Sequence, residues 1–159
     1  MTSLPTIRLA TAADAANVEA LLSSARLPLD GVREALRHFA VADDHGRLVG
    51  VAGIEECGTS GRHALLRSVA VDPTWRNHGL GRALVERAIA LAESRGVHAL
   101  YLLTTTAERY FPTFGFVPTS REGIPDEVRA TAEFQGACPA SAIAMVRHSG
   151  RDVAARRAT

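Results

Sequence analysis

The sequence has few cysteines, no excess of charge of either sign and no long apolar segment. Cys57 and Cys138 are too few for a disulfide framework or a zinc site built on thiolates. The 18 basic residues nearly balance the 17 acidic ones, and a net charge of +1 supplies no overall field that would attract nucleic acid or an anionic membrane. No apolar run reaches membrane-spanning length, and the N-terminus lacks the apolar core of an export signal. These absences favour a cytoplasmic protein without nucleic-acid or membrane partners, in which any anion-binding site is local.

The histidines are too dispersed for a metal site. None pairs with another at i, i+4, and the H-E-x-x-H pattern is missing. The six residues are His38, His45, His63, His78, His98 and His148. We therefore expect no metal cofactor.

The hydrophobic pattern predicts one α/β domain over residues 1–149 and a frayed tail over residues 150–159. Strands are expected at residues 7–10, 39–42, 48–55, 64–71, 100–104 and 140–147. Helices are expected at residues 11–25, 30–38 and 125–134, with a further one between residues 80 and 96, and Thr11 and Asp30 are the expected caps of the first two. The result is a mixed sheet of six or seven strands with about four helices.

A glycine-bearing turn joins the strand at residues 64–71 to the helix that follows. Its sequence is Arg76-Asn77-His78-Gly79-Leu80-Gly81. A strand that enters such a turn and then a helix gathers free backbone N–H groups and the positive end of a helix dipole around one point. Glycine permits φ > 0 and close approach of a phosphate, and Arg76 can add a charge-assisted bond. The turn therefore predicts an anion site, although six residues alone also fit an ordinary turn.

The position of this turn in the sheet supports a ligand site. Strands at residues 64–71 and 100–104, joined through a helix, should be parallel neighbours. The turn then lies at the carboxyl end of the sheet, where ligands of open α/β sheets bind.

The strand, the R-x-x-G-x-G turn and the helix together resemble motif A of the GNAT superfamily of N-acetyltransferases. A second segment, Ala107 to Phe116 with the sequence A-E-R-Y-F-P-T-F-G-F, is similar to the A-x-x-F-Y-x-x-x-G-F segment of that family. The two motifs stand in the family's order and cover about residues 64–117. The resemblance implies a GNAT fold with a bulged and splayed central strand pair. It also implies acetyl-CoA as co-substrate and a homodimer as the oligomeric state to test.

The resemblance further implies which residues hold acetyl-CoA. The turn would bind the pyrophosphate, and the main chain near Val69 and Val71 would meet the pantetheine arm and the thioester oxygen. The expected cofactor-binding residues are Val69, Ala70, Val71, Arg76, Asn77, His78, Gly79, Leu80, Gly81, Arg82 and Phe111. The side chains of Val69 and Val71 fit a plain core strand equally well.

Acetylation of an amine needs a base for the ammonium proton and an acid for the departing thiolate. Glu55, at the end of the preceding strand, is the first candidate base, and Glu56 and His63 rank after it. Each of the three fits a solvated turn charge as well. The usual acid of the family is a tyrosine, and Phe111 stands at the matching position. Tyr110, one residue earlier, is the candidate acid, and a solvent proton is the alternative.

A charge inside an apolar strand marks Arg67 as a candidate substrate-binding residue, together with Ser68. A buried guanidinium needs a partner, and its bidentate geometry suits a carboxylate, a phosphinate or an arsenic oxyanion. Strand alternation places Ser68 on the opposite face unless a bulge changes the parity. An internal ion pair of Arg67 with Glu55 or Glu56 is an equal alternative.

Several local strings narrow the resemblance to the GNAT proteins of arsenic-resistance operons. They are A-L-L-R-S-V-A-V at residues 64–71, Y-L-L-T-T-T at residues 101–106 and C-P-A-S-A at residues 138–142. This implies direct transfer, in a ternary complex, to the primary amine of a small amino-acid-like substrate such as an arsenical or phosphinothricin-like compound. Two alternatives stay open: an amino-acid N-acetyltransferase with a glutamate-like substrate, and a non-catalytic acyl-CoA sensor, which Phe111 favours.

Overall fold

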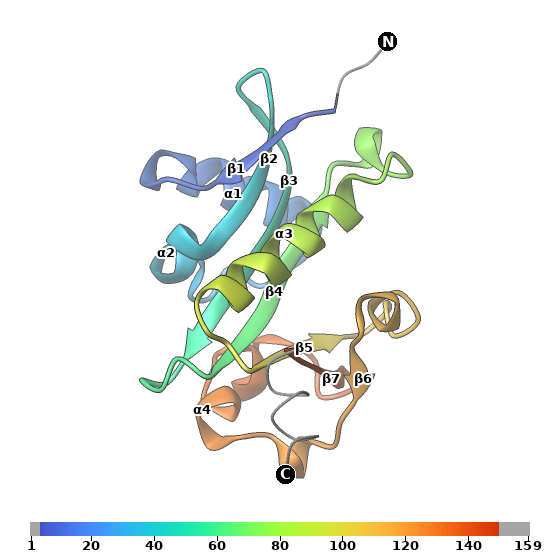
Figure 1. Cartoon of the computed structure of the whole chain (residues 1–159). Helices are drawn as coiled ribbons and strands as arrows, with labels where there is room; N and C mark the ends of the chain where they lie inside the picture. The colour runs from blue at the N-terminus through green and yellow to red at the C-terminus, as the bar shows by residue number, and fades with distance from the viewer. Residues whose placement is uncertain (1–3, 150–159) are drawn as a thin grey trace. The chain divides into compact units, whose positions relative to one another are not determined.

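The computed structural model describes residues 4–149, and the tail expected at residues 150–159 lies outside that range. The described chain forms seven strands and four α-helices, with several single-turn helices between them (Figure 1). The strands are β1 Thr6–Leu9, β2 Phe39–Asp44, β3 Arg47–Cys57, β4 His63–Val71, β5 Ala99–Thr104, β6 Val117–Pro118 and β7 Ile143–His148. The α-helices are α1 Ala15–Ser24, α2 Val32–Ala35, α3 Leu80–Ser94 and α4 Asp126–Arg129. The expected α/β class is confirmed.

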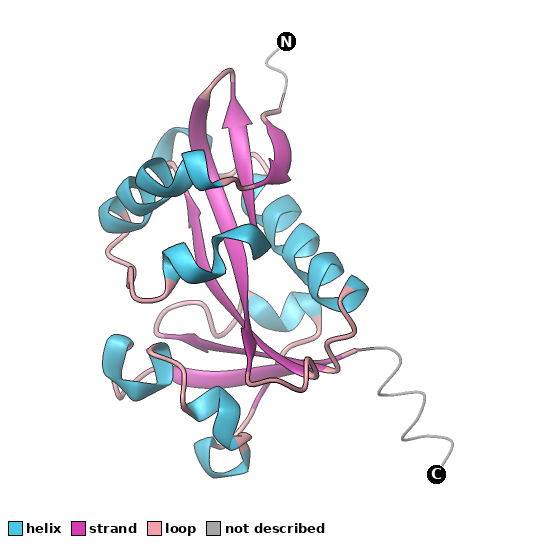
Figure 2. Ribbon diagram, turned by 90° about the vertical axis from the view of Figure 1, so that its left-hand side faces the viewer, coloured by secondary structure: helices cyan, strands magenta, loops and turns pink. Residues whose placement is uncertain are grey.

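The strand order in the sheet is β1-β2-β3-β4-β5-β7-β6. β4 and β5 pair in parallel, as a helical crossover requires. The pairs β1–β2, β2–β3, β5–β7 and β6–β7 are antiparallel, so the sheet is mixed, and its long strands stand out in Figure 2. The chain divides into two compact units. The first runs up to Glu55 and includes residues 66–91, and the second holds residues 56–65 and the described residues from Ala92 onwards.

In the first unit, helices α1 and α2 share a core with β2. Val18 and Leu22 lie one helical turn apart on α1, and both are fully buried. They belong to one apolar cluster with Val32 of α2 and with Phe39 and Val41 of β2. The apolar spacing of α1 therefore produces the packing that it predicts.

A two-residue turn closes the β2–β3 hairpin. His45 and Gly46 have φ of 52° and 93°, the left-handed pair that matches the twist of the two strands. Asp43 Oδ1 accepts a hydrogen bond from the N–H of Gly46 at 2.7 Å. Beyond the turn, Asp44 lies opposite Arg47 and Asp43 opposite Leu48, and the register then shifts at an irregularity between Ala42 and Asp43.

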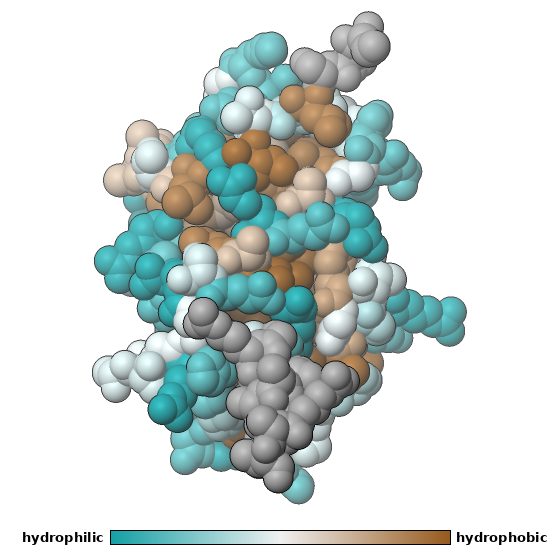
Figure 3. Space-filling model, in the orientation of Figure 1, coloured by the Kyte–Doolittle hydropathy of each residue, from teal (hydrophilic) through white to brown (hydrophobic). Residues whose placement is uncertain are grey.

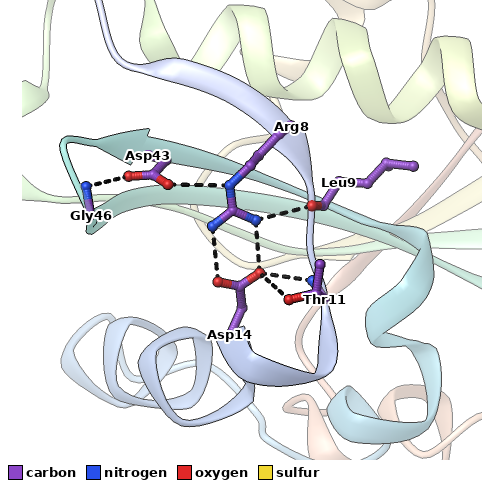
Figure 4. Close-up of polar contacts among 6 residues, drawn as sticks. All are labelled: Arg8, Leu9, Thr11, Asp14, Asp43 and Gly46. Carbon is purple, nitrogen blue, oxygen red and sulfur yellow. Dashed lines mark hydrogen bonds and ion pairs between the residues drawn. The ribbon is translucent and has the colours of Figure 1, made fainter.

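Arg8 joins β1 to the segments around it (Figure 4). Its guanidinium donates to both carboxylate oxygens of Asp14, at 2.8 and 3.0 Å, and to Asp43 at 3.2 Å. Asp14 also accepts the N–H of Thr11 at 2.7 Å, in the capping interaction expected from the sequence. The hydrogen bonds from Arg8, with a smaller contribution from Thr11, lower the pKa of Asp14 to about 2.

α3 has the amphipathic pattern expected for it. Leu84, Val85 and Ala88 are fully buried, whereas Glu86 is exposed. Hydrophilic residues cover much of the surface that Figure 3 displays. After the helix, Gly96 has a φ of +82°, the left-handed conformation that ends a helix. Within residues 4–149, no helix combines the length and the apolar character needed to cross a membrane.

The second unit has its own core. Tyr101 of β5 and Val146 of β7 pack with Ile124 and with Val128 of α4. β6 adds two residues beside β7. The second of the two motifs, residues 107–116, lies between β5 and β6 in this unit.

Two of the expected helices differ in the structure. The helix expected at residues 30–38 starts after Gly31, whose φ of +76° makes it the cap in place of Asp30. It is an α-helix for four residues and then tightens into a 3₁₀ turn.

The single helix expected at residues 125–134 is broken. α4 has four residues, and a separate π turn follows at Glu133–Ala137. The N–H and the hydroxyl of Thr131 both donate to the carbonyl of Val128, at 3.1 and 2.8 Å. A hydroxyl that competes for this carbonyl favours a tight turn over a continued α-helix.

Candidate active site

β4 carries a bulge at Ser68. The φ of Ser68 is +59°, a left-handed conformation that costs a residue with a Cβ about 1–2 kcal/mol. Such a residue changes the alternation of side chains along a strand. Arg67 and Ser68 are both buried, and Arg67 Nε donates to Ser68 Oγ at 3.1 Å. The contact between these neighbouring side chains fits the exception that the sequence left open, in which a bulge changes the parity.

The parallel ladder between β4 and β5 is short. It runs from His63, opposite Ala99, to Leu65, opposite Tyr101, and no further pair with β5 forms in the described part of the chain. β4 nevertheless continues to Val71. The described pairing with β5 therefore involves only the first three residues of β4.

After β4, the chain passes through a 3₁₀ turn at Pro73–Trp75 and enters the glycine turn. Asn77 and Gly79 have φ of 65° and 79°, both left-handed. Leu80 begins α3 and is buried, whereas Gly79 is exposed. A Cβ placed on Gly79 would meet no atom within 4 Å. The turn therefore leaves open space beside its main chain.

Asp72 holds this turn in place. Its carboxylate accepts hydrogen bonds from the N–H and the hydroxyl of Thr74, at 2.9 and 2.7 Å, and from Arg47 at 3.1 Å. Its own N–H donates to the carbonyl of Val49 at 2.8 Å. The bonds from Thr74 lower the pKa of Asp72 below its ordinary value. Sequence reasoning missed this residue, although Asp-Pro-Thr directly after a strand is a recognisable turn cap.

The glycine turn has the chemistry of an anion site. α3 is 15 residues long, and the N–H groups of its first turn have no acceptor within the helix. The helix dipole adds positive potential at the same point. Arg76 and Arg82 are exposed on this stretch, and Arg82 contacts Glu86 at 3.3 Å. Residues 76–79 and Arg82 are thus exposed around these N–H groups, where a phosphate group can bind, whereas Leu80 is buried.

Glu55 and Arg67 form an ion pair in the first unit. Arg67 Nη1 donates to Glu55 Oε1 at 2.7 Å, and Nη2 lies 3.5 Å from the carbonyl oxygen of Pro28. The Arg67 side chain has no exposed surface, whereas 23% of the Glu55 side chain is exposed. This is the internal pair that the sequence left open. Direct substrate contact by Arg67 and Ser68 stays a prediction, and the burial of both residues does not favour it.

The two other candidate bases have partners in the second unit. Glu56 pairs with Arg95, and His63 Nδ1 contacts the carboxylate of Glu127. All three candidate bases are thus ion-paired and similarly exposed, and the choice of Glu55 stays a prediction. Across residues 4–149, no three histidine, cysteine or acidic side chains converge on a point that would hold a metal ion.

Tyr110 and Phe111 belong to an aromatic cluster of the second unit. Phe111 is buried, and its ring centroid lies 5.8 Å from that of Phe116. The Tyr110 ring lies 5.4 Å from Phe111 and 5.1 Å from Phe114, in edge contacts. Tyr110 is 37% exposed and carries a phenol hydroxyl. Phe111 has no such group.

The sequence profile of the acetyltransferase (GNAT) family matches residues 11–116, well over half of the chain. The chain belongs to the GNAT family. The matched region contains the bulged strand, the glycine turn and the Tyr110–Phe111 pair. The family expected from the two motifs is therefore confirmed.

Proteins of similar sequence are acetyltransferases. An uncharacterized N-acetyltransferase of Chlorobaculum tepidum is 32% identical over 100 residues, which are 63% of each chain. An amino-acid acetyltransferase of Pseudomonas fluorescens is 31% identical over 90 residues, which are 57% of this chain and 21% of that protein. The match thus spans less than two thirds of the length of either relative.

Solved structures share the fold. Rv2747 of Mycobacterium tuberculosis, in complex with CoA, has a TM-score of 0.77 and 22% identity, covering 91% of this chain and 99% of that one. N-acetylglutamate synthase of Neisseria gonorrhoeae, complexed with coenzyme A and N-acetyl-glutamate, has a TM-score of 0.76 and 22% identity, covering 93% of this chain and 36% of that one. The GNAT fold is confirmed by this likeness.

Proposed function

We propose that this protein is an acetyl-CoA-dependent N-acetyltransferase that moves an acetyl group to the primary amine of a small amino-acid-like substrate. The observation that carries the proposal is the path from the Ser68 bulge in β4 to the left-handed turn at Gly79. That path offers main-chain hydrogen-bonding groups, then an open anion site at the start of α3, in a chain that belongs to the GNAT family.

The pyrophosphate of acetyl-CoA would bind at the turn, to the N–H groups of residues 77–82 and to Arg76. The pantetheine arm and the thioester oxygen would bind the main chain from Val69 to Val71. Phe111, a residue of the second unit, would also contact the cofactor. An N–H group aimed at the thioester oxygen stabilises the charge that develops there, and one such donor is worth about 3 kcal/mol. Solved neighbours described as complexes with coenzyme A support this assignment.

The chemical step would be a direct transfer in a ternary complex. The amine nitrogen attacks the carbonyl carbon of the thioester, a C–N bond forms, and the C–S bond breaks to release the thiolate of CoA. Glu55 would accept the first proton, which the ammonium group loses before attack, and Tyr110 would protonate the thiolate. The second nitrogen proton, lost as the amide forms, would pass to solvent, from which Tyr110 would be reprotonated. These roles need no covalent acyl-enzyme.

Two observations bear on the acceptor. One relative is an amino-acid acetyltransferase, and one solved neighbour holds N-acetyl-glutamate, which supports an amino-acid acceptor. The strings at residues 64–71 and 101–106, which are similar to those of arsenic-resistance GNAT proteins, support an arsenical or phosphinothricin-like amine. Both acceptors combine a primary amine with an acidic group.

An acceptor panel tests the proposal. Purified protein is mixed with acetyl-CoA and with glutamate, other amino acids, phosphinothricin or an arsenical amino acid, and the release of free thiol is followed. We expect turnover with at least one amino-acid-like amine and little with simple alkyl amines. Binding of acetyl-CoA in calorimetry without turnover on any amine would favour the sensor alternative. Absence of acetyl-CoA binding would refute the cofactor assignment.

A further inference from the structure

Ser68 keeps a backbone conformation that its own side chain opposes. Its φ of +59° lies in a region that residues with a Cβ rarely occupy, and it interrupts an otherwise regular strand. Strained residues of this kind persist where the surrounding structure holds them. The groups that hold Ser68 are therefore part of what shapes the following main chain, Val69 to Val71.

The guanidinium of Arg67 is the group that holds Ser68. Its Nε donates to Ser68 Oγ at 3.1 Å, and its Nη1 donates to Glu55 Oε1 at 2.7 Å. Its Nη2 lies 3.5 Å from the carbonyl oxygen of Pro28, in the segment between α1 and α2. One rigid, planar and permanently charged group thus joins the bulge of β4, the end of β3 and this segment.

The segment before α2 is shaped around the same guanidinium. A Cβ placed on Gly31 would lie 3.2 Å from Arg67 Nη1 and 3.8 Å from Glu55 Oε1. The φ of Gly31 is +76°, which also favours glycine. The backbone therefore passes the ion pair at a distance that leaves little room for a side chain.

We infer that Arg67 is a positioning residue for acetyl transfer. It fixes the Ser68 bulge, and with it the main chain from Val69 to Val71, and it holds the Glu55 carboxylate in one orientation. The inference rests on the proposed function and deepens it, because Arg67 acts on the reaction through Ser68 and Glu55 without touching the substrate. Its full burial fits this role better than direct recognition of an acidic acceptor.

The inference predicts a specific kinetic defect. A displacement of about 1 Å at a reacting group can lower a rate by about a hundredfold. Loss of the Arg67 contacts should therefore lower kcat more than it lowers the affinity for acetyl-CoA, whose pyrophosphate site at Arg76 to Gly81 is separate. A residue that binds the acceptor directly would instead raise the KM for the acceptor at nearly constant kcat.

Arg67→Met tests the inference, because methionine fills much of the space without the planar fork. Arg33→Met is the matched control, since it removes the exposed Arg33–Glu19 ion pair of the same unit. In folded protein, well below the melting temperature, we expect kcat of Arg67→Met to fall at least about tenfold. The dissociation constant for acetyl-CoA should rise by a smaller factor than kcat falls, because the pyrophosphate site at Arg76 to Gly81 is left intact. Arg33→Met should keep kcat within about twofold of the wild type.

Two further variants keep the test informative if Arg67→Met does not fold. Ser68→Gly removes the hydroxyl but accepts the left-handed φ without strain, so the protein should fold while kcat falls at least about threefold. Arg67→Lys keeps the charge but lacks the planar fork of the guanidinium. Compared with Arg67→Met, it should recover folding more fully than it recovers kcat.

Two sets of outcomes would overturn the inference alone, in a wild-type protein that binds acetyl-CoA and turns over. One is an unchanged kcat in folded Arg67→Met, or in Ser68→Gly and Arg67→Lys if Arg67→Met is unfolded. The other is a raised KM for the acceptor with kcat retained, which would indicate that Arg67 binds the substrate directly. A wild-type protein that binds no acetyl-CoA would refute the proposed function and this inference with it.

Discussion

At Gly79, a left-handed backbone lies beside open space. Valine at this position must adopt an unfavourable φ, and its branched side chain would occupy the space through which a phosphate approaches. We expect Gly79→Val to lower the free energy of unfolding by about 1–2 kcal/mol. We also expect it to weaken acetyl-CoA binding at least about tenfold, which corresponds to about 1.4 kcal/mol. Denaturant unfolding and isothermal titration calorimetry measure the two effects.

Gly96→Val is the control for this substitution. Gly96 has a φ of +82° and the same open surroundings, but it follows the other end of α3. It should lose similar stability and keep acetyl-CoA affinity within about twofold. Equal affinity in Gly79→Val, Gly96→Val and the wild type would argue against the phosphate site.

Tyr110 carries the proposed proton transfer to the CoA thiolate. Tyr110→Phe removes the hydroxyl and keeps the edge contacts with Phe111 and Phe114. We expect kcat to fall at least about tenfold, because general acid catalysis contributes about a hundredfold or more. Acetyl-CoA affinity should be unchanged, and steady-state kinetics with calorimetry checks both. Tyr101→Phe, at the buried tyrosine of the second core, should keep kcat; an unchanged rate in Tyr110→Phe would assign the proton to solvent.

How well single residues can be predicted depends on how local their interactions are. The turn at residues 76–81 is predictable, because an anion site of this kind uses N–H groups that are consecutive in the sequence. The partner of Arg67 is not. The choice between Glu55 and Glu56 depends on how β3 and β4 align, and this register between two strands leaves no local pattern in the sequence.

At the scale of elements, the Arg8 cluster makes β1 and its neighbours sensitive to acid. The pKa of Asp14 falls from an ordinary value of 3.8 to about 2 in the folded protein. A lowered pKa means that the ionised carboxylate stabilises the fold, so this stability is complete above about pH 5 and is lost as the pH falls towards 2. We expect Asp14→Asn to cost about 1–2 kcal/mol at pH 7, less than the full shift implies because Arg8 is partly exposed.

Unfolding curves recorded from pH 7 to pH 3 check this prediction. The difference between Asp14→Asn and the wild type should shrink as the pH falls. Asp126→Asn is the control, because Asp126 pairs with Arg129 but its side chain is 93% exposed. That variant should change stability by less than about 0.5 kcal/mol at any pH. A pH-independent loss in Asp14→Asn would contradict the assignment.

Elements with strong periodicity form where the sequence predicts them. β4 and α3 differ little from their expected ranges, because apolar spacing and glycine punctuation are local properties. The helix expected at residues 125–134 breaks because the hydroxyl of Thr131 competes for a backbone carbonyl. Whether a threonine does so depends on tertiary packing, and periodicity carries no information about it.

At the scale of the whole molecule, the composition has a chemical consequence for the proposed use of acetyl-CoA. All 18 basic residues are arginines, so no side chain carries a primary amine. Guanidinium groups stay protonated and are poor nucleophiles, whereas lysine is the usual target of acetylation. We expect peptide mass mapping after prolonged incubation with acetyl-CoA to find no acetylated arginine.

Arg87→Lys provides the positive control, because it places a primary amine on an exposed position of α3. That variant should acquire an acetyl group under the same conditions. Side-chain acetylation of the wild type would contradict the prediction. If no side chain of the wild-type protein is acetylated, self-acetylation adds no background to the thiol release that the acceptor assay measures.

The two outermost strands of the sheet limit how copies of this protein can associate. β1 has four residues, and its Arg8 is paired with Asp14 and Asp43. β6 has two residues, one of them Pro118, which has no N–H to donate. A second copy that added a strand at either edge would gain few hydrogen bonds. If the protein forms a homodimer, we therefore propose that helices and loops make the contact, and that concentrated solutions resist the edge-to-edge stacking that leads to fibres.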